Sequence, residues 1–149
     1  MFIDKFINKN VIIKEISSIP KDYALTEEEI LYYVKDNSLD EYKPRDIVFV
    51  SNYKYENGIQ GSNHLFVIID QNNLVPIDYF GLLISSHIDK VKYKSNIYLK
   101  RNNFNNLKKD SIVKTDVVYK LNKENIKFKI GEVSIEEFNT YLNIIKKGH

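Results

Sequence analysis

The chain has 149 residues, of which 43% are hydrophobic, enough for one domain with an added arm but too few for two ordinary domains. Its 22 Lys and Arg against 20 Asp and Glu give a net charge of +2, well short of the charge of a dedicated duplex-DNA-binding protein. The sequence contains no cysteine, which excludes disulfides, thiolate metal sites and a cysteine nucleophile.

Residues 1–43 are expected to form an N-terminal arm that carries a helix. Within it, Thr26-Glu27-Glu28-Glu29 matches the capping box, in which a Thr hydroxyl and a Glu side chain bind free N–H groups at a helix start. The helix is expected to run from Glu27 to about Asp36. Its apolar face, which is too apolar to remain exposed, would carry Ile30, Leu31 and Val34.

Short apolar runs separated by turn signals predict the strands of the main body. These runs cover residues 47–50, 64–70, 74–86, 96–100, 111–118 and 128–133. The runs 64–70 and 74–86 are joined by the polar turn Gln71-Asn72-Asn73 and predict an antiparallel hairpin in the core. Such pairing would bring His64 and the Ser85-Ser86-His87 end to the same edge of the sheet.

The remaining segments add helical pieces to this sheet. Residues 87–95 are expected to be a partly helical polar link, and 122–125 a single helical turn. Ser134-Ile135-Glu136-Glu137 is a second capping box and begins a C-terminal helix. The apolar stripe of this helix would contain Ile135, Phe138, Tyr141, Leu142 and Ile145. Short strands with helices at the chain ends predict a mainly β, α+β fold, either a small half-open barrel or a strongly bent sheet.

Motifs for several large enzyme classes are absent from the sequence. It contains no P-loop, no dinucleotide-binding Gly fingerprint, no HExxH and no zinc-ligand spacing. Its three His residues, one of them terminal, cannot form a closed zinc site by themselves, so neither a metal nor a cofactor is expected. No apolar run approaches ~18 residues, so we expect a cytoplasmic protein with no membrane-spanning segment.

Several sequence segments of the main body follow one another in a characteristic order. No single segment is very specific, but the ordered set is. The segments include Arg45-Asp46-Ile47-Val48-Phe49-Val50, a Gly-containing loop, Phe66-Val67-Ile68-Ile69, a strand ending in Ile84-Ser85-Ser86, Lys109-Asp110-Ser111-Ile112-Val113-Lys114-Thr115-Asp116 and a Ser-capped closing helix. This order resembles the MazF/PemK family of toxin endoribonucleases from type II toxin–antitoxin systems. The resemblance covers roughly residues 44–147, so residues 44–149 are expected to be the family domain and 1–43 an accessory arm.

The resemblance implies an SH3-like barrel of about five to seven strands with a C-terminal helix, usually in a homodimer. It implies a metal-independent endoribonuclease that cuts single-stranded RNA, including mRNA, at short sequences. The implied reaction is attack of a 2′-OH on the adjacent phosphate, leaving a 2′,3′-cyclic phosphate and a 5′-OH. A cognate antitoxin protein would neutralise the enzyme by blocking its RNA groove, near which the acidic turn of the arm could also compete with phosphate.

Four residues are the expected catalytic set. His64 stands where many relatives carry an Arg, a departure that keeps acid–base chemistry but weakens phosphate binding. Ser85 falls at the position of a Thr or Ser that contacts the scissile phosphate in relatives. Lys114 and Asp116 match the Arg-x-Asp arrangement of PemK-type members. Their spacing would place both on one face of a strand, with the cation on phosphate and the carboxylate as base.

Six further residues are expected RNA contacts: Arg45, Tyr53, Lys54, Tyr55, Ser86 and His87. Three of them lie in the polar loop 52–63, which is longer than a hairpin needs and therefore favours a functional role. A purely structural role stays open as an alternative for all ten candidates. The alternatives are a strand-end His bound to backbone, a Ser-Ser strand terminus, a surface ion pair, solvated cations and packed Tyr rings. The alternative function is a non-catalytic SH3-like module that binds nucleic acid or a peptide.

Overall fold

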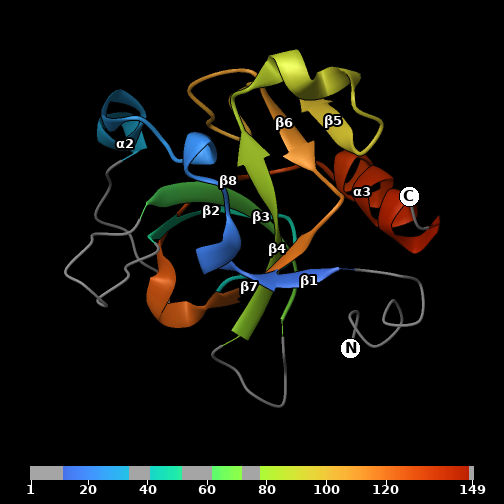
Figure 1. The fold of residues 1–149 in the computed structure, drawn as a ribbon, viewed down its shortest axis with the longest axis horizontal. Coiled ribbons are helices and arrows are strands. Elements are labelled where there is room, and N and C mark those ends of the chain that lie inside the picture. Colours follow the sequence, from blue (N-terminus) through green and yellow to red (C-terminus); the bar gives the residue numbers. More distant parts are fainter. Residues whose placement is uncertain (1–11, 34–40, 52–61, 72–77, 148–149) are drawn as a thin grey trace.

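The computed structural model describes residues 12–33, 41–51, 62–71 and 78–147. The described chain forms one mixed sheet with a helix at its C-terminal end (Figure 1). Its strands are β1 (Ile13–Glu15), β2 (Asp46–Ser51), β3 (Asn63–Gln71), β4 (Asp78–Ser85), β5 (Asn96–Leu99), β6 (Ser111–Lys114), β7 (Val118–Asn122) and β8 (Ile126–Glu132). Its helices are α2 (Glu27–Tyr33), α3 (Ile135–Lys147) and the 3₁₀ turns η2 (Ile16–Ser18), η3 (Lys21–Tyr23), η5 (Ile88–Lys92) and η6 (Lys123–Asn125).

The mainly β, α+β fold is confirmed. The sheet has the order β1-β7-β4-β3-β2-β8, and β6 joins it by pairing with β4 and with β5. The pairs are antiparallel except for β1, which lies parallel to β7. The described residues contain eight strands rather than the expected five to seven, because the arm supplies β1 and because one predicted strand is divided into two.

The division falls within the run 111–118, which was expected to be a single strand. Thr115 interrupts it: both its backbone N–H and its hydroxyl donate to the carbonyl of Ser95, at 2.9 and 2.7 Å. The chain then resumes as β7, which pairs with the first half of β4, whereas β6 pairs with the last two residues of β4. Strand alternation therefore does not relate Lys114 to Asp116, and the predicted reason for their sharing a face is wrong.

The central hairpin is confirmed as β3 paired with β4. Leu65 lies opposite Ile84 in this pair, and the register continues through Ile68 opposite Gly81. His64 and Ser85 are each one residue beyond the Leu65–Ile84 pair, so the two polar strand ends meet at one edge. Gln71, predicted as the first turn residue, is instead the last residue of β3 and pairs with Tyr79, and residues 72–77 lie outside the described residues.

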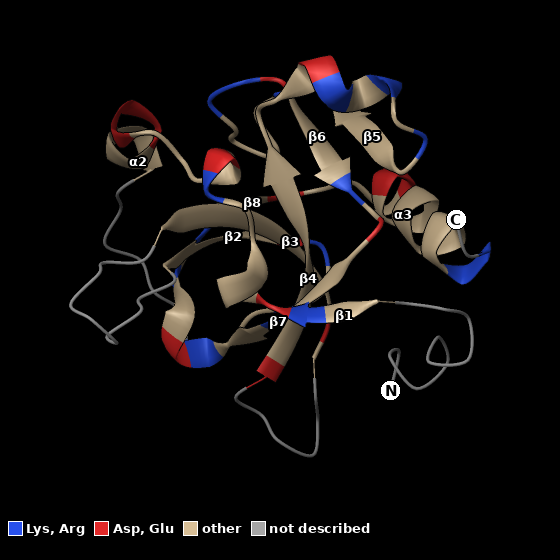
Figure 2. Ribbon diagram, in the orientation of Figure 1, with Lys and Arg blue, Asp and Glu red and all other residues tan. Residues whose placement is uncertain are grey.

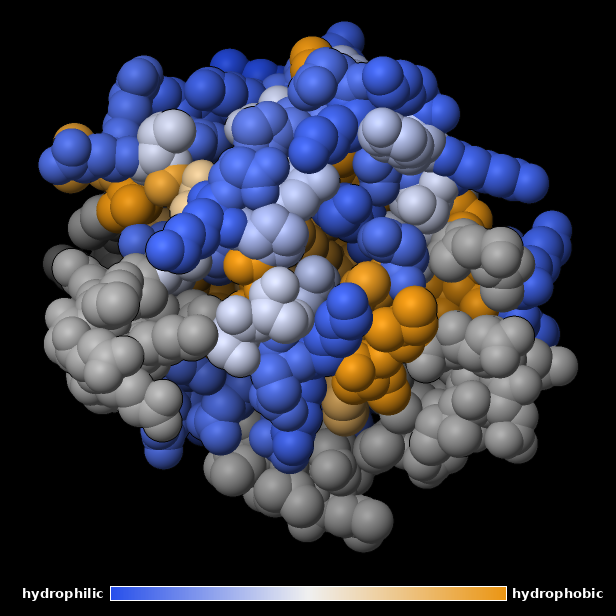
Figure 3. Space-filling view, in the orientation of Figure 1, coloured by the Kyte–Doolittle hydropathy of each residue, from blue (hydrophilic) through white to orange (hydrophobic). Residues whose placement is uncertain are grey.

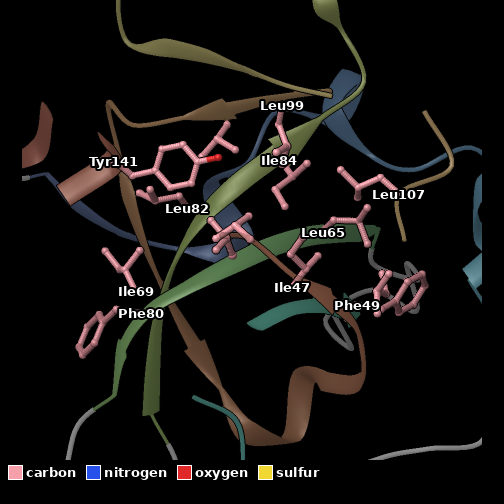
Figure 4. Packing of buried hydrophobic residues seen from close by; sticks show 14 of the residues in the cluster. Ile47, Phe49, Leu65, Ile69, Phe80, Leu82, Ile84, Leu99, Leu107 and Tyr141 are labelled. Carbon is pink, nitrogen blue, oxygen red and sulfur yellow. The ribbon is translucent and has the colours of Figure 1, made fainter. Parts of the chain in front are cut away.

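The two faces of the sheet support two separate cores. The larger core packs alternate residues of β2, β3 and β4 against α3, as Figure 4 shows for Leu65, Leu82, Ile84 and Tyr141. The smaller core lies on the opposite face of these strands and is built around Phe66. His64 and Phe66 are two residues apart on β3, so His64 belongs to the face of the smaller core.

The arm supplies side chains to both cores. Ile16 and Ile19 are buried in the smaller core, and Tyr33 is buried in the larger one. The expected packing of the arm on the body is therefore present in the structure. The expected boundary between an arm at 1–43 and a domain at 44–149 remains a prediction.

Helix α2 begins as predicted but presents a different face. In the confirmed capping box, the Thr26 N–H donates to Glu29 Oε1 at 3.0 Å and the Glu29 N–H donates to Thr26 Oγ1 at 3.2 Å. Ile30 packs against the larger core as predicted, but Leu31 is 72% exposed, so the predicted apolar face is wrong at Leu31. The orientation is set instead by Tyr33, whose hydroxyl accepts a hydrogen bond from the Lys108 N–H at 2.7 Å. Val34 lies outside the described residues.

Helix α3 is capped as its sequence predicts. The Ser134 N–H donates to Glu137 Oε1 at 2.9 Å, and the Glu137 N–H donates to Ser134 Oγ at 3.0 Å. Tyr141 and Ile145 are buried and Phe138 and Leu142 pack against the larger core, but Ile135 is 61% exposed, so the predicted apolar stripe is wrong at its first residue. No helix in the described part of the chain is long and apolar enough to cross a membrane.

Gly131 on β8 lies against the backbone of the loop before β6. A Cβ built at Gly131 would stand 2.5 Å from the carbonyl oxygen of Asn105, a rigid backbone atom. Gly131→Ala is therefore expected to lower the unfolding free energy by ~1–3 kcal/mol, the usual cost of overpacking. Chemical denaturation measures this loss. An unchanged unfolding free energy would show that the loop moves freely away from β8.

Candidate functional site

The strand ends gather six of the predicted residues. We call His64, Ser85, Ser86, His87, Lys114 and Asp116 the strand-end cluster; they come from the start of β3, the end of β4 and the end of β6. β4 links the other two strands, because it pairs with β3 through Leu65–Ile84 and with β6 through Ser85–Ile112. Positions 64, 85 and 114 alternate onto the face of the smaller core.

His64 is a buried member of this cluster. Its side chain is 1% exposed, and Nε2 lies 2.7 Å from the hydroxyl oxygen of Ser62. Burial lowers the pKa of His64 to about 4, and a backbone hydrogen bond with Tyr23 only partly opposes this shift. His64 is therefore neutral at pH 7, in a state that can accept a proton.

Ser85, Ser86 and His87 continue from the end of β4. Ser85 is buried, and its Oγ accepts a hydrogen bond from the His87 N–H at 3.2 Å. Ser86 Oγ donates to Glu29 Oε2 at 3.4 Å, and His87 Nε2 donates to the carbonyl oxygen of Asp22 at 2.7 Å. Ser86 and His87 are thus bonded to residues of the arm, and Ser85 to the backbone of its own turn.

Lys114 and Asp116 lie together although no strand joins them. Lys114 Nζ is 3.8 Å from Asp116 Oδ1, and the Lys114 side chain is largely buried while Asp116 is partly exposed. Burial raises the pKa of Tyr119, and the Asp116 carboxylate adds to this shift, which places Asp116 near the Tyr119 ring as well. In Figure 2 the end of the β6 ribbon, the strand that ends at Lys114, is coloured blue.

Tyr23 is a site residue that the sequence did not indicate. Lys90 Nζ donates to the Tyr23 hydroxyl at 3.0 Å, and Lys114 Nζ lies 5.1 Å from the centre of its ring. The ring of His87 packs edge-on against Tyr23, with 5.6 Å between the ring centres. No local signal could have revealed Tyr23, because it reaches the cluster only through the packing of the arm.

Lys90, a second residue of this region that the sequence did not indicate, lies in η5. It bonds to the Tyr23 hydroxyl, which is the main cause of its raised pKa, and its Nζ is 3.8 Å from Asp22 Oδ2. The sequence showed only a polar link here, with one Lys among several.

Arg45 is not part of the strand-end cluster. It precedes β2, while His64 pairs with Val50 near the other end of that strand, about 16 Å away at ~3.3 Å per residue. Its Nε donates to the Val133 carbonyl at 3.0 Å, and a guanidinium nitrogen lies 3.8 Å from Glu132 Oε1. Its backbone has a positive φ of 83°. These contacts give Arg45 a structural role at the start of β2.

Tyr53, Lys54 and Tyr55 lie outside the described residues. Among the residues that the structure does describe, no group of three or more His, Asp or Glu side chains is arranged to hold a metal ion.

Comparison with known proteins gives one family. A family model described as "PemK-like, MazF-like toxin of type II toxin-antitoxin system" matches residues 43–148. No curated protein matches the chain significantly. The matched span includes the whole strand-end cluster and leaves Tyr23, Asp22 and Glu29 outside it.

Proposed function

Because the chain belongs to the PemK-like, MazF-like family of toxins from type II toxin–antitoxin systems, we propose that it is an endoribonuclease that cleaves single-stranded RNA. The supporting observation is the strand-end cluster. It brings an imidazole, a hydroxyl and an ammonium group onto one face of three adjoining strands, with the Asp116 carboxylate 3.8 Å from the ammonium group. The proposal includes neutralisation by an antitoxin protein, a homodimeric assembly and action in the cytoplasm.

In the proposed reaction the RNA 2′-OH attacks the adjacent phosphorus and the bond from phosphorus to the 5′-oxygen breaks. A base must take the 2′-OH proton, an acid must protonate the 5′-oxygen, and donors must stabilise the charge on the phosphate oxygens. The products are a 2′,3′-cyclic phosphate and a 5′-OH. No step requires a metal ion, so the proposed enzyme works in a chelator.

The chemistry of each side chain supports a different role in this scheme. Asp116 is an anionic carboxylate next to Lys114, so it is the proposed base, and Lys114 is the proposed partner of the phosphate. Ser85 is the proposed donor to a non-bridging oxygen. His87 already donates a hydrogen bond through Nε2 and is the proposed acid. His64, neutral and buried, is a second candidate base.

The deciding experiment measures RNA cleavage by Ser85→Ala and Asp116→Asn in the presence of EDTA. Each change is expected to reduce the cleavage rate by ~10²-fold or more, the usual contribution of a group acting on the reacting atoms. Matched controls are Ser17→Ala and Glu136→Gln, both exposed and far from the cluster in sequence. End analysis of the products should find cyclic phosphates. Parental rates in both site variants would reject this assignment of the site.

The second candidate is a binding module without catalysis. It is favoured by one observation: His64, at the position of the usual Arg, is 1% exposed and in this conformation cannot reach RNA. The same assay separates the two functions. A module binds single-stranded RNA without producing cyclic-phosphate ends, whereas the proposed enzyme produces them in EDTA.

A further inference from the structure

We infer that residues 20–25, here called the crossing segment, are an intramolecular inhibitor that covers the strand-end cluster and must be displaced before RNA binds. This inference rests on the proposed function, because it assigns a state to the same site. The crossing segment lies outside the span shared with the toxin family. Together with Glu29 of α2, it lies against four of the six residues of the cluster: His64, Ser86, His87 and Lys114.

The ring of Tyr23 occupies the centre of the cluster. Lys90 Nζ lies 4.5 Å from the ring centre and Lys114 Nζ lies 5.1 Å from it, so both cations face the π system. The His87 ring meets it edge-on. An aromatic ring held between cations and an imidazole takes the place that an RNA base would occupy by stacking beside its phosphate.

Acidic and carbonyl oxygens of the arm bind two hydrogen-bond donors of the cluster, on Ser86 and His87, and the neighbouring Lys90. Asp22 Oδ2 lies 3.8 Å from Lys90 Nζ, and the Asp22 carbonyl accepts from His87 Nε2 at 2.7 Å. Glu29 Oε2 accepts from Ser86 Oγ at 3.4 Å. These anionic and carbonyl oxygens are bound where a phosphate would be bound. They therefore compete with RNA for the same ammonium, imidazole and hydroxyl groups.

The backbone of the crossing segment is hydrogen-bonded to the start of β3, beside the cluster. The Leu25 N–H donates to the carbonyl of Asn63 at 2.8 Å, directly before His64. The backbone of Tyr23 lies close enough to His64 to oppose in part the lowering of its pKa by burial. Together these contacts leave His64 only 1% exposed, although it stands at a strand end.

The crossing segment is anchored at both ends and exposed between them. Ile19 is buried in the smaller core on one side, and Tyr33 is buried in the larger core on the other. Between them, Lys21 and Asp22 are exposed and Tyr23 is half-buried. Displacing the crossing segment therefore breaks its polar and ring contacts and the partial packing of Tyr23 and Leu25 on the two cores, while both buried anchors stay in place.

The test compares full-length Asp22→Asn/Tyr23→Ala with the matched control Glu27→Gln/Tyr32→Ala. The control makes the same changes of charge and size at exposed positions of α2. Three quantities are measured: reactivity of His87 toward diethylpyrocarbonate, affinity for a labelled mixed-sequence single-stranded RNA, and the rate of its cleavage. Circular dichroism establishes that both variants are folded.

The expected result is faster modification of His87 and about tenfold tighter RNA binding with faster cleavage in the site variant only, because apparent affinity scales with the open fraction. Faster His87 modification with unchanged or weaker binding and measurable cleavage would overturn the inhibition and leave the proposed function intact. No binding or cleavage by any of the three proteins, with His87 opened, would overturn the proposed function and this inference with it.

A second variant tests displacement without opening the site in advance. The chain contains no Trp, so Tyr23→Trp introduces a single fluorescent reporter in the crossing segment, and Tyr32→Trp serves as its control. Adding the RNA is expected to increase acrylamide quenching of the reporter at position 23 and to leave the control unchanged. RNA binding without any change in quenching at position 23 would show that the crossing segment stays in place, which overturns the inference.

Discussion

A chain that begins at residue 44 is expected to melt at least about 10 °C below the full-length protein. The reason is the number of buried side chains that the truncation removes: Ile16, Ile19, Tyr33 and Tyr42. Burial of such side chains contributes ~1.5–3 kcal/mol each, and the entropy of ordering the arm offsets only part of the sum. Thermal unfolding followed by circular dichroism measures the difference. Equal melting temperatures would make the arm dispensable for stability.

Substitution of two neighbouring tyrosines tests the contribution of the arm to stability without truncating the chain. Tyr33 is 2% exposed and its hydroxyl accepts the Lys108 N–H, whereas Tyr32 is 47% exposed. Tyr33→Ala is expected to lower the unfolding free energy by ~3–5 kcal/mol, as for other buried aromatic truncations. Tyr32→Ala should cost less than about 1 kcal/mol, because surface changes are usually small. Similar losses in both variants would mean that α2 is not docked through Tyr33.

The stability of the protein is expected to fall as the pH is lowered from about 6.5 to about 4, by ~3 kcal/mol from His64 alone. In this window the unfolded chain binds a proton at His64 but the folded chain does not, because burial lowers the pKa of the imidazole in the fold. Protonation therefore favours the unfolded state, and the loss is complete once the pH reaches the folded pKa.

His64→Gln isolates this contribution from the carboxylates that titrate nearby. The variant retains a polar side chain but cannot take up a proton in this range. Both proteins are unfolded with urea at about pH 7.5, 6, 5 and 4.5, values that run from above the unfolded pKa of His64 to just above its folded pKa. The unfolding free energy of the parent should fall more steeply than that of the variant. Parallel curves would show that His64 is accessible to protons in the folded protein.

Local patterns predicted much of the fold. Both capping boxes were recognisable because Thr26 with Glu29, and Ser134 with Glu137, bind within one helical turn. The β3–β4 hairpin followed from two apolar runs and a polar turn. Its polar ends could be predicted to meet because antiparallel pairing fixes their register.

Features that depend on distant contacts were not predictable in the same way. The break at Thr115 is made by a carbonyl of Ser95, twenty positions earlier in the chain. The exposure of Leu31 follows from the docking of Tyr33 on Lys108. The position of Tyr23 over Lys114 joins two segments with no shared local pattern.

The parallel pairing of β1 with β7 also sets the order in which the protein can be completed. Ile13 pairs with Val118, so this contact closes nearly the longest loop that the chain offers, at a high entropic cost. During synthesis β1 has no partner until β7 has left the ribosome. Ile12 and Ile13 remain partly exposed even in the folded protein, at 50% and 38%, and the surface of Figure 3 includes hydrophobic areas. Until β7 is made, the side chains of β1 lack the strand beside which they lie. The residues of β1 are thus made early and paired late.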